Sequence, residues 1–437
     1  MSGTTRPALR ACRDCGLVQL VPALSPGGSA HCLRCDATLR RNHRDPMNAS
    51  LAFCLSALVL FVIATSAPLL QVSRGGQVHA ANLFSGPIGL ENNGMWELAA
   101  VVLLATVGAP LAKLGCTLYV LLALRLPNPP RHIRRVFAWA MHLSRWSMIE
   151  IYLLGVFVAY VKLGALVRIE VGTALYALGG LLLAMVAADA MLDRQAVWEE
   201  MERRGIPQVP IDRAAIIAAA GADNRPAGDA STGSGASDDG SRARVIGCHT
   251  CDLVSIVPDD AHAQCPRCGS SLHPRRRDSI AATWAFSLAA LVLYLPANIY
   301  PVLTITWFGS GRPNTILGGV RDLIRSGLWP LALLVFFASI AVPVLKLISL
   351  GILLISTQRH SRWRLHDRAT LYRVVEGIGR WSMIDVFMIS ILVALVQFGT
   401  LETVIPEPGA IAFAGVVILT MFAAECFDPR LMWDAAE

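Results

Sequence analysis

Eight of the eleven cysteines fall into two sets whose spacing is typical of a metal site. Each set is C-x2-C, a gap of 16 or 13 residues, and a second C-x2-C. Two such knuckles that converge on one ion supply the four thiolates that Zn²⁺ prefers, and they leave no open position for a substrate. We therefore expect two structural zinc sites, with iron in a rubredoxin-like site as the less favoured alternative. The expected ligands are Cys12, Cys15, Cys32, Cys35, Cys248, Cys251, Cys265 and Cys268.

Disulfide bonds are the other reading of such cysteines. Both sets stand beside Arg-rich segments that are expected to face the reducing side of a membrane, so disulfides are disfavoured. The remaining three cysteines, Cys54, Cys116 and Cys426, lie in hydrophobic runs without a spacing pattern, and we expect them to pack as small apolar side chains.

The composition predicts a multi-pass membrane protein. Of the 437 residues, 54% are hydrophobic and only 16% are charged, and the uncharged runs exceed the roughly 20 residues that a spanning helix needs. We expect eight spans, at about 50–72, 95–124, 146–167, 171–191, 280–304, 327–357, 381–400 and 408–426.

The second half of the chain repeats the first half. CRDCGLVQLVP at 12–22 returns as CHTCDLVSIVP at 248–258, and RWSMIE at 145–150 returns as RWSMID at 380–385. The fold class predicted is an α-helical polytopic membrane protein of two tandem four-helix units, each preceded by a small zinc-ribbon β domain. The expected domains are a ribbon at 1–45, a four-span unit with a short helix at 46–205, a disordered linker at 206–244, a ribbon at 245–277 and a four-span unit at 278–437.

The basic residues predict an orientation rather than a nucleic-acid surface. The net charge is +7, but the arginines lie in blocks beside the hydrophobic runs, within 6–44, 125–145, 275–277 and 359–380. By the positive-inside rule these blocks, and with them both termini, are expected on the cytoplasmic side. Arg312, Arg321 and Arg325 depart from this pattern, because they lie on the side that is expected to be periplasmic.

Charged residues inside the hydrophobic runs mark a candidate polar site. The chain has only three lysines, and two of them, Lys113 and Lys346, each follow a proline by three residues, Pro110 and Pro343, where we expect kinked helices with freed carbonyls. The simpler reading is that both lysines extend to the interface. The functional reading pairs them with buried partners in a transport network, because an unpaired buried charge is costly. The candidate partners are Ser147, Glu150, Asp189, Ser382, Asp385 and Glu425.

No motif for ATP-driven or hydrolytic chemistry is visible. The dipeptide Gly-Lys of a phosphate-binding loop occurs nowhere, and no GxSxG element is present, so we do not expect an enzyme.

The tandem cysteine knuckles, the twin four-span units, the two Pro–Lys pairs and the doubled RWSM(I)(E/D) motif together resemble the paraquat-inducible protein A family, including its lipophilic-envelope-transport members. The resemblance covers the whole chain apart from the linker. It implies an inner-membrane subunit that passes phospholipid between the inner membrane and a periplasm-spanning tunnel formed by a mammalian-cell-entry (MCE) domain protein. It also implies that the eight cysteines bind zinc and that Lys346, Ser382, Asp385 and Asp189 belong to the polar network of the route.

Two other hypotheses remain open from the sequence. The first is a stand-alone secondary transporter or exporter of amphiphilic compounds. The second is a redox-sensing membrane scaffold in which the metal knuckles report thiol oxidation and the spans serve as an anchor.

Overall fold

The computed structural model describes residues 7–43, 45–74, 77–164, 168–206, 243–258, 263–307, 310–396 and 402–436. The expected linker falls almost wholly outside the described residues.

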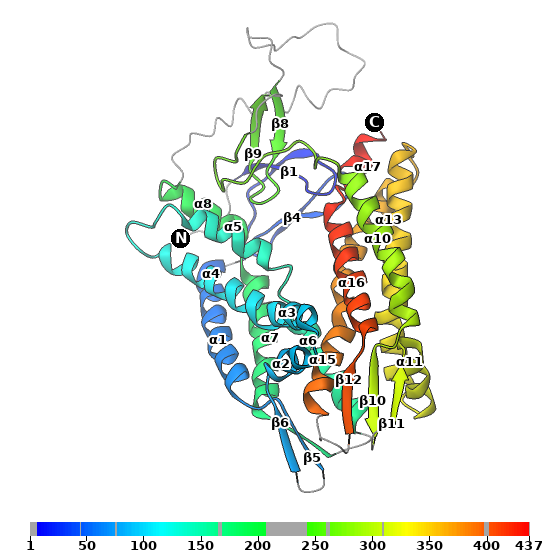
Figure 1. Ribbon diagram of the computed structural model, residues 1–437. Coiled ribbons are helices and arrows are strands. Elements are labelled where there is room, and N and C mark those ends of the chain that lie inside the picture. The colour runs from blue at the N-terminus through cyan, green and yellow to red at the C-terminus, as the bar shows by residue number, and fades with distance from the viewer. Residues whose placement is uncertain are drawn as a thin grey trace.

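Long helices form the body of the molecule (Figure 1). Seven of the described helices are long and apolar enough to cross a membrane. They are α1 (Pro46–Ser66), α3–η1–α4 (Trp96–Ala123), α7 (Thr173–Met191), α10 (Ser279–Ile299), α12–η2–α13 (Trp329–Gln358), α14–η3–α15 (Leu365–Leu395) and α16 (Pro408–Cys426). The eighth expected span is α6 (Ile149–Gly164), which has only 16 residues, fewer than a perpendicular span needs. Its counterpart in the repeat, α15 (Ile384–Leu395), continues from α14 (Leu365–Ile378) through a 3₁₀ turn, and so belongs to a longer helix.

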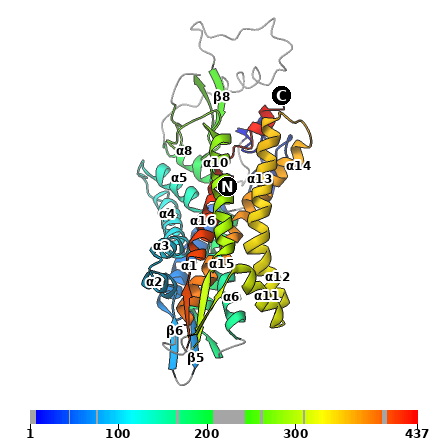
Figure 2. The same cartoon turned by 45° about the vertical axis from the view of Figure 1, so that its right-hand side comes forward.

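Strands occupy both ends of the helical body. At one end, here the ribbon end, three hairpins contain six of the eight cysteines: β1 (Ala8–Ala11) with β2 (Val18–Val21), β3 (Ser29–His31) with β4 (Thr38–Arg41), and β8 (Ala243–Gly247) with β9 (Val254–Pro258). Cys265 and Cys268 lie in a turn that a single bridge between Gln264 and Ser271 closes. At the opposite end, here the sheet end, each unit has one antiparallel three-stranded sheet (Figures 1 and 2). Their orders are β6 (Gln77–Ala81), β5 (Leu70–Arg74), β7 (Arg168–Val171) and β11 (Ser310–Asn314), β10 (Leu303–Trp307), β12 (Glu402–Pro406).

The sheet-end strands correct two predicted spans. The runs 50–72 and 280–304 were expected to be helical throughout, but the helices end at Ser66 and Ile299. Each helix is followed by an extended residue that precedes a proline, Ala67 before Pro68 and Tyr300 before Pro301. Proline disfavours the helical conformation of the residue before it, so both helices end there and the following residues enter a sheet.

In each unit, a glycine at the start of the fourth helix contacts the backbone that follows the first helix. A Cβ on Gly172 would lie 2.0 Å from the Pro68 carbonyl oxygen, and one on Gly409 would lie 2.4 Å from that of Pro301. Only glycine allows this approach, which brings the last strand of each unit back to the turn after its first helix.

Short helices fill the connections. On the sheet-end side these are α2 (Ser85–Asn92) and α11 (Ile316–Arg325). At the ribbon end they are α5 (Ile133–Leu143), α8 (Arg194–Arg203) and α17 (Leu431–Asp434). The helix α8 follows the last long helix of unit one, and the Asp193 side chain caps it by accepting a hydrogen bond of 2.9 Å from the Gln195 backbone N–H.

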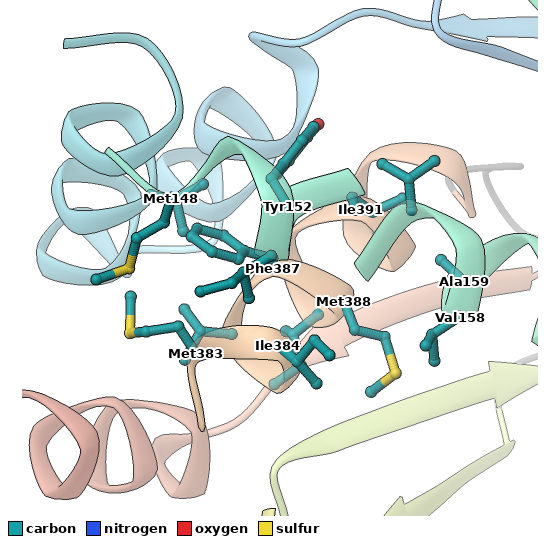
Figure 3. Close-up of a cluster of buried hydrophobic side chains, with 14 of the residues drawn as sticks. Met148, Tyr152, Val158, Ala159, Met383, Ile384, Phe387, Met388 and Ile391 are labelled. Carbon is teal, nitrogen blue, oxygen red and sulfur yellow. The ribbon is translucent and has the colours of Figure 1, made fainter. Parts of the chain in front are cut away.

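The two units meet along α6 and α15, at the centre of the molecule. Figure 3 shows the apolar side chains that they share: Tyr152 packs edge-on against Phe387 with ring centroids 5.7 Å apart, and Met148 and Ile384 are fully buried beside them. Gly155 lets the helices approach, because a Cβ there would lie 3.1 Å from Cβ of Phe387.

Each ribbon packs against the unit that does not directly follow it in the sequence. In the sequence, each ribbon directly precedes one of the two units. The first ribbon instead packs its cysteines against unit-two residues, including Leu353, Tyr372 and Phe427. The second packs its cysteines against unit-one residues, including Phe137 and Trp198. Sequence order therefore does not fix which surface a ribbon covers.

Candidate metal centres and transport site

Each four-cysteine set forms one compact buried cluster. The four sulfur atoms of each set lie within 4.8 Å of one another. Nearest pairs are Cys12 with Cys35 and Cys15 with Cys32, both at 3.5 Å. These separations are far longer than a disulfide bond, and they are close to the distance of about 3.8 Å expected between thiolates placed 2.3 Å from a tetrahedral ion. The second cluster has the same geometry, with Cys248 3.5 Å from Cys268 and Cys251 3.4 Å from Cys265. Both clusters thus fit a metal ion with four sulfur ligands.

The four knuckles share one backbone turn. Four residues after the first cysteine of each knuckle, the chain takes a left-handed conformation, at Gly16, Asp36, Asp252 and Gly269. In each knuckle this residue donates its N–H to the carbonyl of that cysteine. Glycine and aspartate are among the residues that adopt this conformation at least cost, which explains why either serves at this place. The two glycines were visible in the sequence, whereas the two aspartates gave no recognisable signal.

The helix α8 holds both ribbons through buried ion pairs. Arg40 of the first ribbon, whose side chain is 2% exposed, contacts Glu199 at 2.7 Å and Asp193 at 3.2 Å. Arg267 of the second ribbon contacts Glu202 at 2.6 Å. Burial, together with the charge of Arg40, lowers the pKa of Arg10 to about 10, so that this arginine still carries its charge near Glu199 at neutral pH.

The ribbons also contact each other and unit two directly. Arg13 forms a bidentate pair with Asp252, at 2.6 and 2.8 Å, which joins the two ribbons. Arg373 on α14 donates a hydrogen bond to the carbonyl of the ligand Cys35 and pairs with Asp14 at 3.0 Å. The ribbon end is therefore one connected polar assembly.

In unit one, the candidate lysine has a carboxylate partner. Lys113 Nζ lies 2.5 Å from Asp189 Oδ2, and the Lys113 side chain is 10% exposed. The cavity at this pair is only about 10 Å³, which is barely the size of one water molecule. This pair therefore has no space for a ligand.

In unit two, the equivalent lysine meets a hydroxyl instead. Lys346 is 3% exposed and its Nζ donates a hydrogen bond of 3.3 Å to the Thr420 hydroxyl oxygen. The space beside it depends on Gly379, where a Cβ would lie 2.8 Å from Lys346 Nζ. Among the residues that the structure describes, no carboxylate forms an ion pair with Lys346.

Glu425, the carboxylate equivalent to Asp189 in the repeat, pairs with an arginine and not with Lys346. Glu425 of unit two forms an ion pair with Arg145 of unit one. Beside this pair, Trp146 of unit one contacts Phe422 of unit two, with ring centroids 5.8 Å apart. This ion pair and this aromatic contact join the two units side by side.

A cavity of about 370 Å³ opens beside these contacts. Its walls come from both units. The lining residues are Ser144, Arg145, Trp146, Lys346, Arg373, Glu376, Gly377, Gly379, Met421, Phe422, Ala424 and Glu425.

The other predicted network residues form no hydrogen bond or ion pair with Lys346 among the described residues. Asp385 is 4% exposed, and it lines a separate cavity of about 40 Å³ with Lys162 of unit one. The buried Ser382 hydroxyl donates to the Gly379 carbonyl at 2.8 Å. Ser147 is buried, and Glu150, at the start of α6, is partly buried and in polar contact. Ser382 is thus hydrogen-bonded to the glycine beside Lys346, whereas Asp385 lines a different cavity, and the network as a whole stays a prediction.

A π-helical turn precedes both prolines. The turns η1 (Leu104–Gly108) and η2 (Phe337–Ala341) lie just before Pro110 and Pro343. In each turn a buried hydroxyl, of Thr106 or Ser339, donates to the carbonyl four residues earlier, at 2.8 or 2.6 Å. Such turns are local irregularities that often mark functional sites.

Several residues of these sites could not be predicted from the sequence. Thr420 and Glu376 gave no signal, because threonine and glutamate are common and neither belongs to a motif. Arg145 and Arg373 were counted only as basic residues beside the spans. Lys162 was noticeable as the third lysine of the chain, but it had no proline and no counterpart in the repeat.

Comparison with known proteins identifies the family. A family model described as paraquat-inducible protein A matches residues 47–202 and again 280–437. The chain belongs to the paraquat-inducible protein A family. Its two matched segments confirm the tandem units, and the seven candidate spans agree with the predicted multi-pass membrane protein. No solved structure matches the chain.

Curated relatives in this family are named as transport proteins. The chain is 33% identical over 424 residues to the intermembrane transport protein PqiA of Escherichia coli K12, covering 97% of this chain and 95% of the relative. It is 31% identical over 427 residues to the lipophilic envelope-spanning tunnel protein A of the same strain, covering 98% and 91%. It is 26% identical over 428 residues to a probable intermembrane transport protein of Haemophilus influenzae, covering 97% and 95%.

Proposed function

We propose that this chain is the inner-membrane subunit of an intermembrane lipid transport system, and that it passes phospholipid between the inner membrane and a periplasmic MCE-protein tunnel. The observation that carries the proposal is the cavity between the two units. It holds the buried Lys346, which forms no ion pair with a carboxylate among the described residues. A polar site inside a membrane protein is costly and is retained for function. The names of the relatives, intermembrane transport protein and envelope-spanning tunnel protein, also support a role in transport.

The proposed orientation follows from charge. The ribbon end carries the arginine blocks, so this end and both termini are proposed to be cytoplasmic. The two three-stranded sheets at the other end would then face the periplasm, where a tunnel protein would dock. The arginines of α11, Arg321 and Arg325, lie at this end, and a short amphipathic helix can hold them at the membrane surface.

The two cysteine clusters are proposed to bind one Zn²⁺ each, as structural sites. Four sulfur ligands leave no open coordination position, so the metal would stabilise the ribbons rather than react with a substrate. We propose no enzymatic activity for this chain.

One experiment tests the function. The protein is purified in mild detergent from native membranes, and co-purifying proteins, lipids and metals are identified by mass spectrometry and elemental analysis. We expect an MCE-domain partner, phospholipid and about two zinc ions per chain, as two closed thiolate sites require. The protein is then reconstituted with that partner, and transfer of labelled phospholipid between donor and acceptor vesicles is measured.

The alternatives predict other results. Transport of amphiphilic compounds by the chain alone, with no periplasmic partner, would indicate a stand-alone transporter. Iron in the clusters, together with function that survives Lys346→Met but not cysteine substitutions, would indicate a redox-sensing scaffold. Lys113→Met is the matched control, because Lys113 occupies the same position of the repeat but is neutralised by Asp189.

A further inference from the structure

From the cavity between the units we infer that this chain binds the headgroup of a zwitterionic phospholipid, with the phosphate at Lys346 and the amine at Glu376. This inference rests on the proposed function, and it adds the headgroup class and the residues that recognise it.

The first step is the asymmetry of the repeat. Lys113 and Lys346 are equivalent, as are Asp189 and Glu425, yet only the first lysine meets its carboxylate. In unit two, Glu425 is held by Arg145 from the other unit. The packing of the two units thus leaves the buried Lys346 ammonium without a carboxylate partner in the part of the chain that the structure describes. A buried ammonium without a carboxylate is unfavourable unless another anion approaches it.

The second step is the donor capacity of Lys346. An ammonium has three N–H donors. One of them contacts the Thr420 oxygen at 3.3 Å, and the Thr420 hydroxyl itself donates to the Val417 carbonyl at 2.9 Å. The remaining donors of Lys346 have no partner among the described residues, and Lys346 lines the cavity. A phosphate oxygen is a suitable acceptor for them.

The third step is the charge of the lining. Three cations and two carboxylates line the cavity. Arg145 and Glu425 neutralise each other, and Arg373 is paired with Asp14 at 3.0 Å. The charges that remain are Lys346 inside and the exposed Glu376, for which the described residues provide no ion pair. One cation and one carboxylate in the same cavity match a phosphate and an amine on one ligand.

The fourth step is size and polarity. At about 370 Å³, the cavity lies at the lower end of the range for small-molecule sites, so a headgroup fits but two acyl chains do not. The aromatic pair Trp146 and Phe422 forms part of the lining, which suits the glycerol and the first methylenes of a chain. The acyl chains would remain outside, in the bilayer.

The test uses a photo-crosslinking amino acid at Phe422, on the cavity wall. The full-length protein is reconstituted in vesicles of ³²P-labelled phosphatidylethanolamine and phosphatidylglycerol, irradiated, and analysed for covalently bound lipid. The control position is Leu183, which is 71% exposed on α7 of unit one and should contact bulk lipid of either class. We expect phosphatidylethanolamine to be enriched at Phe422 at least about fivefold relative to Leu183.

Two substitutions separate the roles of the charges. Lys346→Met should abolish the enrichment, whereas the repeat-equivalent Lys113→Met should leave it unchanged. Glu376→Gln changes an exposed residue and should preserve folding. It should shift labelling at Phe422 from phosphatidylethanolamine toward phosphatidylglycerol. Equal labelling by both lipids in the wild type, or no response to Lys346→Met, would overturn the inference.

Competition distinguishes a lipid from free phosphate. Short-chain phosphatidylethanolamine should suppress the labelling at Phe422, and inorganic phosphate at the same concentration should not. Suppression by inorganic phosphate alone would assign an oxyanion site and overturn the headgroup inference. The transfer assay is separate: transfer that continues without headgroup selectivity overturns only this inference, while selective labelling without transfer overturns only the proposed function.

Discussion

At the residue scale, identical motifs take different partners in the two halves. Lys113 pairs with Asp189 at 2.5 Å, whereas Lys346 meets Thr420 at 3.3 Å. The ion pair of Glu425 with Arg145 accounts for the difference. Because the Asp189 side chain is 48% exposed, water screens the Lys113 pair, and we expect it to contribute only modestly to stability.

A double-mutant cycle tests this asymmetry. Thermal unfolding in detergent is measured for Lys113→Met, Asp189→Asn and the double variant. The coupling energy should be favourable and up to about 1 kcal/mol, as for a partly exposed pair. The matched cycle of Lys346→Met with Glu425→Gln should give a coupling near zero. A coupling of equal size in both cycles would mean that Lys346 does pair with Glu425.

At the element scale, close helix contacts join the two units. The helix α2 of unit one packs against α15 of unit two at Gly86, where a Cβ would lie 2.3 Å from Ser390 Oγ and 3.1 Å from the Ser390 carbonyl oxygen. The Ser390 side chain is fully buried, so it has little freedom to move away. Small residues at such contacts let helix backbones approach in membrane proteins.

We therefore expect Gly86→Ala to weaken the contact between the units. The added methyl group overpacks the contact and should cost about 1–3 kcal/mol, measured as a lower unfolding temperature of the detergent-solubilised protein. Gly179→Ala is the control, because a Cβ there meets nothing within 4 Å. It should be neutral or slightly stabilising, since alanine favours a helix more than glycine does. Equal effects of both substitutions would contradict this packing.

At the scale of the whole molecule, the ribbons connect the two halves. The first ribbon covers α14 of unit two, through Ala369 and Tyr372. The second ribbon covers α5 of unit one, through Ile133 and Phe137. A ribbon of this size depends on its metal for folding. Loss of metal from one ribbon should therefore first lower the local stability of the unit that it packs against, which is not the unit that follows it in the sequence.

Hydrogen exchange tests this arrangement on equivalent helices of the repeat. Substitution of Cys12 and Cys15 by serine should speed amide exchange in α14 by more than about tenfold, which corresponds to about 1.4 kcal/mol, and leave α5 nearly unchanged. Substitution of Cys248 and Cys251 should have the opposite effect. Faster exchange in the unit that directly follows the altered ribbon would contradict this packing. Metal removal by a strong chelator should affect both helices.

Local features of this protein could be predicted from sequence, because each depends on neighbouring residues. The C-x2-C spacing places two sulfur atoms on one turn, and the long apolar runs must form helices since a bilayer offers the backbone no other hydrogen-bond partners. Repetition of these features predicted the two units and the two metal clusters. The ends of helices α1 and α10, at Ser66 and Ile299, could have been anticipated from Pro68 and Pro301, because proline disfavours a helical residue before it.

Only the tertiary structure decided which residues meet across the two halves. The repeat made Lys113 and Lys346 look alike, and it offered Glu425 as the partner of Lys346. Where the two units pack together, Glu425 instead forms an ion pair with Arg145, and a cavity lies between the units. The packing of each ribbon against the other unit has the same origin. A repeated sequence presents two nearly equal surfaces, and the whole fold decides which of them a ribbon contacts. The sequence thus determined which local units form, and long-range packing determined their partners.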